Sequence, residues 1–504
     1  MTRPRFSVVI PTRNRADTLR SSLATCIDQN FDDYEIVVCD NGEGAEAEQV
    51  VRDAASPRVR YLAPTQPLAM SANWERAVSE AQGEYITVLG DDDGLMPYAL
   101  AELDALITKY ETQAVVWQRG IYTWPTIGVP GEADLLRVPL ARSVVEMNGR
   151  EQILKAVRFE AGYDTLPMIY SAVVHRDLIE RHRRLAGRMF LNVYPDVYSA
   201  FGLGYLADRY IWTSVPMGIA GLSRASNGVA TLMNTSNNAV STDFDRLNAA
   251  FGYIRHPRVP DKMILGPVHV VDCFLHAKDA LFPHDDSLVV DRKAFTVQCL
   301  AAIFDVDQSR RQEARRIVRA SLADDQLLLD WFDSEAPDLP PGKIFSFQPP
   351  QLGFDGFMLS LRTTPYDVKD IAGAVTLTTQ LLGLTSGQIT YDVASWEQMH
   401  ASVANAWKTA EVAQQAQAAA HAETAEQGTY ILAARAQVEQ AELELQASRR
   451  QVEQLQIERT IAAEAVAQLQ HQLGEAQLAA SLRYVPKRLL AKLTGRSPKG
   501  KLTR

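Results

Sequence analysis

The chain has 504 residues, of which 46% are hydrophobic and 22% are charged, and its formal net charge is −10. This length and composition are enough for about two to four folded domains and exclude a wholly disordered chain. The net negative charge argues against nucleic-acid binding by the whole protein. The sequence has neither an apolar run of about eighteen residues nor a signal-peptide pattern, so we expect a cytoplasmic protein with reduced cysteines.

The N-terminal part of the chain alternates between short β-branched runs and helical patterns. Strands are expected at residues 6–10, 35–39, 60–62 and 85–89, and helices at 17–27, 74–81 and 97–107. This order predicts an α/β fold with a mostly parallel sheet.

Polar residues follow three of these expected strands. Thr12 follows the first strand, Asp40 the second, and Asp91, Asp92 and Asp93 the strand at 85–89. Ligands of such sheets bind beyond the carboxyl ends of the strands, so we expect these residues to lie together.

The three adjacent aspartates form an unusual concentration of charge. Neighbouring carboxylates repel one another unless a cation or hydrogen-bond donors compensate. Mg²⁺ is usually held by one or two carboxylates together with substrate phosphates. The triplet therefore indicates a metal and diphosphate site, and the alternative is a solvated acidic turn.

Several motifs in this region resemble a known family. They are Ser7 to Arg15 (SVVIPTRNR), Val37 to Gly42 (VVCDNG), Gly83 to Ile86 (GEYI), and Gly90 to Asp93 followed by Pro97. In their order and spacing they resemble the N-terminal half of family 2 glycosyltransferases with the GT-A fold, over roughly residues 5–225. The resemblance implies that the Pro-Thr turn and the aspartate after the second strand hold the nucleotide, and that the Asp-x-Asp element holds ribose and Mg²⁺ or Mn²⁺. The donor-binding residues implied in this way are Pro11, Thr12, Asn14, Asp40, Asn73, Asp91 and Asp92.

The motifs also depart from the common family pattern. Gly90 stands where the family more often has an aspartate. The metal ligands are therefore either Asp91 with Asp93, which we favour, or Asp92 alone. The Arg that often precedes the second helix is absent from Ser71-Ala72-Asn73, which leaves open whether the donor is a UDP-sugar or another nucleotide sugar.

The family also places a catalytic base about a hundred residues past the metal motif. Inverting sugar transfer needs a carboxylate that deprotonates the acceptor hydroxyl. Asp196 is our candidate, and its alternative role is the N-cap of the helix that follows. Arg224 could donate to a donor phosphate, since a guanidinium suits that geometry, and its alternative is a surface or salt-bridging residue.

The middle of the chain, residues 231–335, has helical periodicity and is expected to extend the catalytic domain. His269, Asp272 and His276 share one helix face there. We interpret them as capping or core-edge residues, the alternative being a metal set. Residues 336–403 form a Pro- and Gly-containing linker and a stretch without an assigned structure.

The C-terminal part has a different composition. Residues 404–480 are rich in Ala, Gln and Glu and carry a heptad pattern from Ile431 onward, which predicts a coiled coil and a homo-oligomer. Residues 481–504 interleave basic residues with leucines and predict a short amphipathic helix on an anionic membrane surface, with nucleic acid as the rival partner. This tail resembles those of bacterial enzymes that assemble surface polysaccharide on lipid carriers.

These features together predict a GT-A domain at residues 1–230. The protein is expected to lie peripherally at the inner face of the cell membrane. The expected activity is inverting, metal-dependent transfer from a nucleotide sugar to a glycan or lipid-linked acceptor in bacterial surface polysaccharide synthesis. One alternative is a nucleotidyltransferase, although the glycine-rich loop expected after its first strand is absent. The other is a non-catalytic coiled-coil scaffold that carries a nucleotide-sugar-binding relic.

Overall fold

The computed structural model describes residues 3–64, 66–127, 133–224, 239–260, 265–303, 308–336, 352–354, 358–384 and 389–391. The chain divides into two compact units, residues 1–401 and 402–504, and every described residue belongs to the first. The expected coiled coil and basic tail lie outside the described residues.

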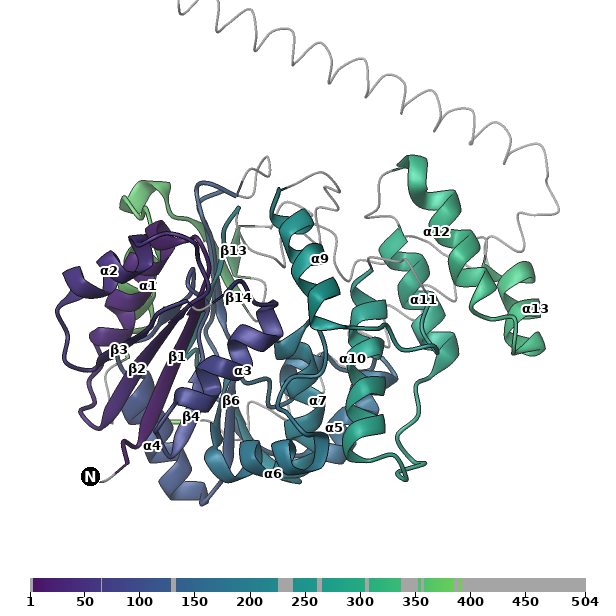
Figure 1. The fold of residues 1–504 in the computed structure, drawn as a ribbon, viewed down its shortest axis with the longest axis horizontal. Helices are drawn as coiled ribbons and strands as arrows, with labels where there is room; N and C mark the ends of the chain where they lie inside the picture. The colour runs from purple at the N-terminus through teal and green to yellow at the C-terminus, as the bar shows by residue number, and fades with distance from the viewer. Residues whose placement is uncertain are drawn as a thin grey trace, which may run out of the picture. The chain divides into compact units, whose positions relative to one another are not determined.

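An eight-stranded mixed sheet forms the centre of the first unit (Figure 1). Its strand order is β3-β2-β1-β4-β10-β6-β11-β9. The strands are β1 (Phe6–Thr12), β2 (Tyr34–Asp40), β3 (Val59–Leu62), β4 (Tyr85–Val88), β6 (Ala114–Trp117), β9 (Val144–Asn148), β10 (Ala172–His175) and β11 (Arg209–Thr213). The first four strands along the chain pair in parallel, and β10 is antiparallel to both β4 and β6. The predicted α/β class with a mostly parallel sheet is confirmed.

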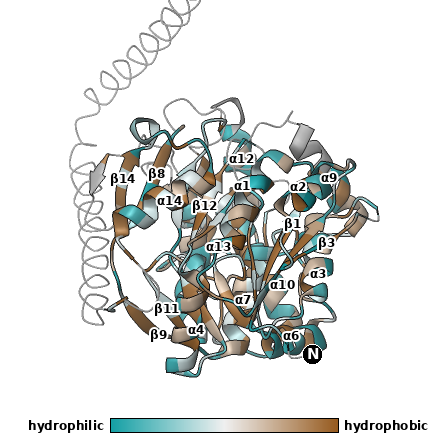
Figure 2. Cartoon of the chain, turned by 90° about the vertical axis from the view of Figure 1, so that its left-hand side faces the viewer, coloured by the Kyte–Doolittle hydropathy of each residue, from teal (hydrophilic) through white to brown (hydrophobic). Residues whose placement is uncertain are grey.

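Alternation of apolar residues along the strands supplies a core on each face of this sheet. In β1, Val8 and Ile10 pack with Leu19 of the first helix, whereas Val9 packs with Trp74 on the opposite face. In Figure 2 the strands are coloured mostly hydrophobic, while helices at the surface such as α6 carry hydrophilic faces. The helices on the Val8 side are α1 (Ala16–Ile27), α2 (Glu46–Ala54) and α4 (Ala99–Tyr110), and those on the Val9 side are α3 (Met70–Glu80), α6 (Arg176–Ala186) and α7 (Pro195–Ala207).

A second, six-stranded sheet lies on the Val8 side and was not predicted from the sequence. Its order is β13-β14-β8-β7-β12-β5. The strands are β5 (Gly94–Leu95), β7 (Gly120–Thr123), β8 (Leu135–Pro139), β12 (Gly218–Leu222), β13 (Gly353–Phe354) and β14 (Met358–Arg362). β14 and the following helix α14 (Ile371–Leu382) come from the stretch that the sequence patterns leave unassigned. α14 packs against α1, β5 and β12, so this stretch completes the first unit.

The expected helical region follows β12 along the chain. It contains α9 (Ala239–Phe251), α10 (Gly266–Leu281), α11 (Arg292–Ile303), α12 (Gln308–Ala320) and α13 (Gln326–Ser334). Helices α10 to α13 share a third core with α7 and α5 (Gly149–Val157), and a short 3-10 helix, η1 (Tyr163–Thr165), lies beside α5 and α7. No described helix is both long enough and apolar enough to cross a bilayer.

Candidate functional site

The parallel pairing of β1 with β2 and β4 brings three predicted site segments together. Thr12 is paired with Asp40 at the ends of β1 and β2, and the aspartate triplet follows β4 on the other side of β1. Thr12, Asp40 and all three aspartates are buried. The strand ends therefore meet at one edge of the sheet, as such topology requires.

Asp91 is held by the turn that follows β1. Its Oδ2 accepts a 2.7 Å hydrogen bond from the Thr12 hydroxyl, and its Oδ1 accepts one of 3.0 Å from the Arg15 guanidinium. Burial raises the pKa of Asp91 above its ordinary value, while the charge of Arg15 opposes that rise. Arg15 was not predicted from the sequence as a partner of the triplet.

Asp92 and Asp93 face the strand β12. The Ser223 hydroxyl donates to Asp92 Oδ2 at 2.6 Å, and the Gly221 amide donates to Asp93 Oδ1 at 2.7 Å. The hydroxyl of Tyr170 also donates to Asp93. Burial raises the pKa of Asp93, and these donors oppose the shift. The three carboxylates are thus turned toward different partners, which limits their mutual repulsion.

Gly221 makes this close approach of β12 to the triplet feasible. A Cβ atom at this position would overlap the backbone carbonyl oxygen of Asp92 and lie 2.7 Å from Trp124 Nε1. The same indole nitrogen donates to the Asp92 carbonyl at 3.1 Å. Only glycine fits between these groups, so β12 and Trp124 together fix the backbone of the triplet.

Asp40 and Asn14 lie on the side of the site expected to take the nucleotide. Asp40 accepts hydrogen bonds of 2.7 Å from the Gly42 amide and from the Tyr61 hydroxyl. Asn14 has a φ of 55°, and its Oδ1 accepts from the Glu43 amide at 3.1 Å. Left-handed geometry is tolerated by Asn better than by most residues. The loops after β1 and β2 are therefore tied to each other.

The remaining predicted donor contacts lie in different surroundings. Pro11 is half-buried within β1. Asn73 is buried on α3, where its side chain exchanges contacts with Cys39, donating to the Cys39 carbonyl at 3.3 Å. Arg224 is exposed and directly follows Ser223, the partner of Asp92. Arg224 thus lies next to a residue that contacts the triplet. The Asn73 amide is instead turned toward β2.

Asp196 is the second residue of α7, and the N-cap position belongs to Tyr194. The alternative role of Asp196 as the N-cap is therefore not observed. The side chain is half-buried, and its carboxylate accepts a hydrogen bond from the Val197 amide. Burial raises the pKa of Asp196, and the Val197 amide and the charge of Arg119 oppose the rise. A carboxyl with a raised pKa is better suited to accept a proton than an ordinary surface aspartate.

Arg119 is a site residue that no sequence motif marked, since it lies between β6 and β7. Its guanidinium carbon lies 5.0 Å from the centre of the Tyr170 ring. Its positive charge lowers the pKa of both Asp93 and Asp196. Arg119 therefore interacts electrostatically with both the triplet and the candidate base.

The carboxylates of the triplet are candidate ligands for a divalent cation. The donor set fits Mg²⁺ or Mn²⁺ in kind, because Asp91 and Asp93 offer only hard oxygen atoms, each with about two lone pairs. Within the part of the chain that the structure describes, no group of three or more His, Cys, Asp or Glu side chains is arranged to hold a metal ion. The alternative interpretation of His269, Asp272 and His276 as a metal set is among the groups that this finding does not support. Two carboxylates together with substrate phosphates suffice for Mg²⁺.

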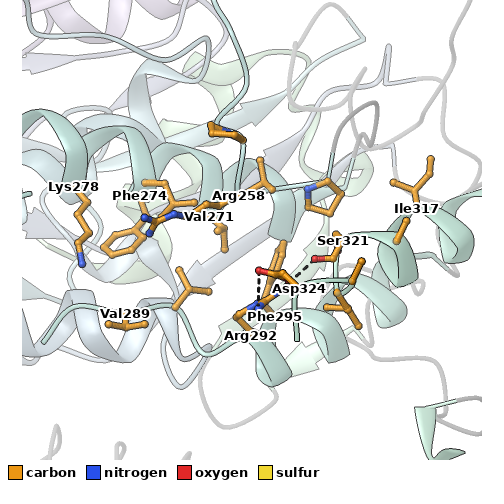
Figure 3. Close-up of a pocket in the computed structure, with 18 of the residues that line it drawn as sticks. Arg258, Val271, Phe274, Lys278, Val289, Arg292, Phe295, Ile317, Ser321 and Asp324 are labelled. Atoms are coloured by element: carbon orange, nitrogen blue, oxygen red, sulfur yellow. Dashed lines mark hydrogen bonds and ion pairs between the residues drawn. The ribbon is translucent and has the colours of Figure 1, made fainter. Parts of the chain in front are cut away.

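A cavity of about 870 Å³ lies elsewhere, among the helices of the middle region (Figure 3). It is lined by α10, α11 and α12 and by the segment around Arg258, mostly with apolar side chains such as Phe274 and Phe295. None of its described lining residues belongs to the candidate site.

Comparison with known proteins gives a family for the N-terminal part of the chain. Residues 7–130 match the model of Glycosyl transferase family 2. Over 103 residues the chain is 32% identical to a GalNAc(5)-diNAcBac-PP-undecaprenol beta-1,3-glucosyltransferase of Campylobacter jejuni. The matched stretch covers 20% of this chain and 33% of that protein. It is 31% identical over 117 residues to the chondroitin synthase of Pasteurella multocida, covering 23% of this chain and 12% of that one. The chain thus spans about a third or less of the length of these two relatives.

Among solved structures, the chain is similar to TarS 1-349 of S. aureus in complex with UDP-GlcNAc. The TM-score is 0.36 at 14% identity, over 65% of this chain and 91% of that one. It is also similar to the mannosyltransferase PcManGT of Pyrobaculum calidifontis in complex with GDP-Man and Mn²⁺. The TM-score there is 0.32 at 14% identity, over 66% of this chain and 89% of the other.

Proposed function

We propose that this chain, whose residues 7–130 match glycosyltransferase family 2, is an inverting glycosyltransferase that uses a nucleotide sugar. The observation that carries the proposal is the meeting of Thr12, Asp40 and the aspartate triplet at the carboxyl ends of three neighbouring parallel strands. In α/β sheets this edge is where nucleotides bind.

The donor would lie across β1, β2 and β4. Asp40 and the Asn14 loop would contact the base and ribose, and Asp91 with Asp93 would hold Mg²⁺ or Mn²⁺ against the diphosphate. The bound metal would supply positive charge that stabilises the departing diphosphate. Exposed Arg224, next to Ser223, is placed to donate to a phosphate oxygen as well.

The base in this proposal is Asp196. Its carboxylate accepts the proton of the acceptor hydroxyl while the hydroxyl oxygen bonds to the anomeric carbon of the donor sugar. The bond from that carbon to the diphosphate breaks at the same time, and the electron pair leaves with the diphosphate. Attack from the face opposite the leaving group inverts the anomeric configuration. The positive charge of Arg119 opposes the burial-driven rise in the pKa of Asp196 and so favours the ionised form that accepts the proton.

The acceptor in this proposal is a glycan or a lipid-linked glycan of a bacterial surface polysaccharide. A C. jejuni relative with an undecaprenol-linked substrate in its name supports this class. Oligomerisation through residues 404–480 and attachment of residues 481–504 to an anionic inner membrane surface belong to the same proposal and rest on the sequence pattern alone.

Calorimetric titration tests the donor half of the proposal. UDP, GDP, dTDP and CMP are titrated into the full chain with and without Mn²⁺. We expect one nucleotide to bind only with the metal, and we expect Asp93→Ala to abolish that binding. If none of the four binds in a metal-dependent way, the non-catalytic scaffold becomes the better description of this protein.

A further inference from the structure

Asp272 of α10 is a fully buried carboxylate that the proposed chemistry does not use. Its Oδ2 accepts a 2.6 Å hydrogen bond from the Asn192 amide and another from the Tyr253 hydroxyl. Its Oδ1 accepts from the His256 amide at 2.8 Å, and His276 Nε2 lies 3.6 Å away. A buried charge is tolerated when donors surround it in this way, and the hydrogen-bond donors here come from two segments outside α10, one at Asn192 and one at residues 253–256.

Asn192 connects this carboxylate to the segment that carries the candidate base. It is fully buried, and its side-chain oxygen accepts from the Tyr194 amide at 3.1 Å while its amide nitrogen donates to Asp272. Its backbone carbonyl accepts a 2.5 Å hydrogen bond from Ser71 of α3. Asn192 is thus bonded to α3, to α10 and to the residue that caps α7.

Tyr194 is held by the same face of α10. Its hydroxyl lies 3.2 Å from His269 Nε2, and the two rings are 4.3 Å apart at their centres. The Cys273 thiol donates weakly to the Tyr194 carbonyl at 3.8 Å. His269, Asp272 and Cys273 therefore all contact residues just ahead of α7, and Asp196 lies two positions after Tyr194.

We propose that Asp272 is a positioning residue, which holds the segment 192–194 through Asn192 and thereby fixes the Asp196 carboxylate for proton transfer. This inference rests on the proposed role of Asp196. The helical region is then part of the catalytic apparatus, because one of its helices sets the geometry of the base. A misplacement of about 1 Å is enough to lower a rate by about 100-fold, so such a contact has kinetic consequences.

The test uses the full chain with Asn192→Ala and Asp272→Asn, each measured for transfer rate and for nucleotide binding. We expect kcat to fall by about 10- to 100-fold. The donor KM and the nucleotide Kd should stay within about threefold of the wild type, because the donor site lies on β1, β2 and β4. Asp333→Asn in α13 is the matched control, since Asp333 is exposed and pairs with Arg319, neither of which contacts the groups around Asp272. It should leave kcat unchanged.

A reciprocal exchange separates positioning from general stability. Asn192→Asp combined with Asp272→Asn restores an amide and a carboxylate facing each other, and kcat should recover to within about threefold of the wild type. A double variant as slow as the singles, or singles that lose nucleotide binding in parallel with kcat, would overturn the proposal and leave a purely structural role.

Amide hydrogen exchange of the same variants provides a readout that does not require catalysis. Exchange should become faster in the segment 192–199 in Asp272→Asn as well as in Asn192→Ala. Unchanged exchange there overturns the inference even if the enzyme is active. Conversely, a wild type without any transfer activity refutes the proposed function, while the exchange pattern still decides whether Asp272 positions this segment.

Discussion

Thr12 donates a 2.7 Å hydrogen bond to Asp91, a residue 79 positions further along the chain. The contact follows from the parallel pairing of β1 with β4, which places the turn after β1 beside the aspartate triplet. Arg15 from the same turn also forms a 3.0 Å ion pair with Asp91. The position of the Asp91 carboxylate is therefore set by the turn that also faces the expected nucleotide.

Arg15→Met should destabilise the protein more than the loss of a surface ion pair would. The side chains of Arg15 and Asp91 are 18% and 4% exposed, and removing one partner of a buried pair costs about 3–5 kcal/mol. The measurement is the free energy of unfolding from urea titration followed by tryptophan fluorescence. Arg20→Met is the matched control, because its pair with Asp53 is 60% and 41% exposed and is worth about 0–1 kcal/mol. Equal losses in the two variants would mean that the Arg15 pair is not a buried interaction.

Asp196→Asn should abolish most of the transfer activity without removing nucleotide binding. Loss of a positioned general base lowers the rate by about 10²- to 10⁴-fold. Single-turnover kinetics measures the transfer rate, and calorimetric titration with the nucleotide measures its binding. A variant that keeps the wild-type rate would exclude Asp196 as the base.

Stability should depend on pH through the same residue. Burial raises the pKa of Asp196 above its ordinary value of 3.8, so the folded state holds this proton more tightly than the unfolded state does. The resulting stabilisation is complete below the unfolded pKa and is lost as the pH rises through the folded pKa. Asp196→Asn removes the titration, and the melting temperature at neutral pH should equal or exceed that of the wild type. A clear drop in melting temperature would show instead that the ionised carboxylate stabilises the fold.

Gly221→Ala should disrupt the triplet from the side of β12. The added methyl group would collide with the Asp92 backbone, and overpacking of this kind costs about 1–3 kcal/mol. We expect the nucleotide affinity to fall at least about tenfold, because the Gly221 amide also holds Asp93. Gly373→Ala in α14 is the comparison, since its nearest neighbour is a Val368 methyl at 3.3 Å. Its melting temperature and nucleotide affinity should stay close to those of the wild type.

A chain ending at residue 230 should fail to fold, whereas one ending at residue 401 should fold. The shorter chain lacks β14, which pairs with β8, and lacks α14, whose Ile371 and Val375 lie against the position of Gly94 in β5. Gel filtration and near-ultraviolet circular dichroism distinguish the two outcomes. A soluble, ordered chain of residues 1–230 would show that the predicted domain boundary is adequate.

Local patterns in the sequence were sufficient to predict the strands β1 to β4 and the polar residues at their ends. β1, β2 and β4 each contain a compact apolar run, and their ends meet because parallel strands bring them to one edge. Helix α2 was missed although Ala47, Val50, Val51 and Ala54 stand at the spacing of one helix face and pack against the core on the Val8 side.

Long-range pairings could not be predicted in the same way. The second sheet joins strands of two to five residues from distant parts of the chain, such as Met358 opposite Pro139. Arg119 likewise reaches the site through tertiary structure alone, since nothing in its local sequence marks it. The place of Asp196 near the start of α7 was predictable, but its surroundings depend on Arg119 and on α10.

The return of β14 to β8 has a consequence for how this protein emerges from the ribosome. β8 is complete early in synthesis, but β14, one of its two partner strands, is made only after the whole helical region has been translated. Until then one edge of the second sheet and the face later covered by α14 stay exposed in the nascent chain. We expect the helices α9 to α13 to form before the sheet that precedes them is closed, so the last described segments of the first unit act as the final step of its folding.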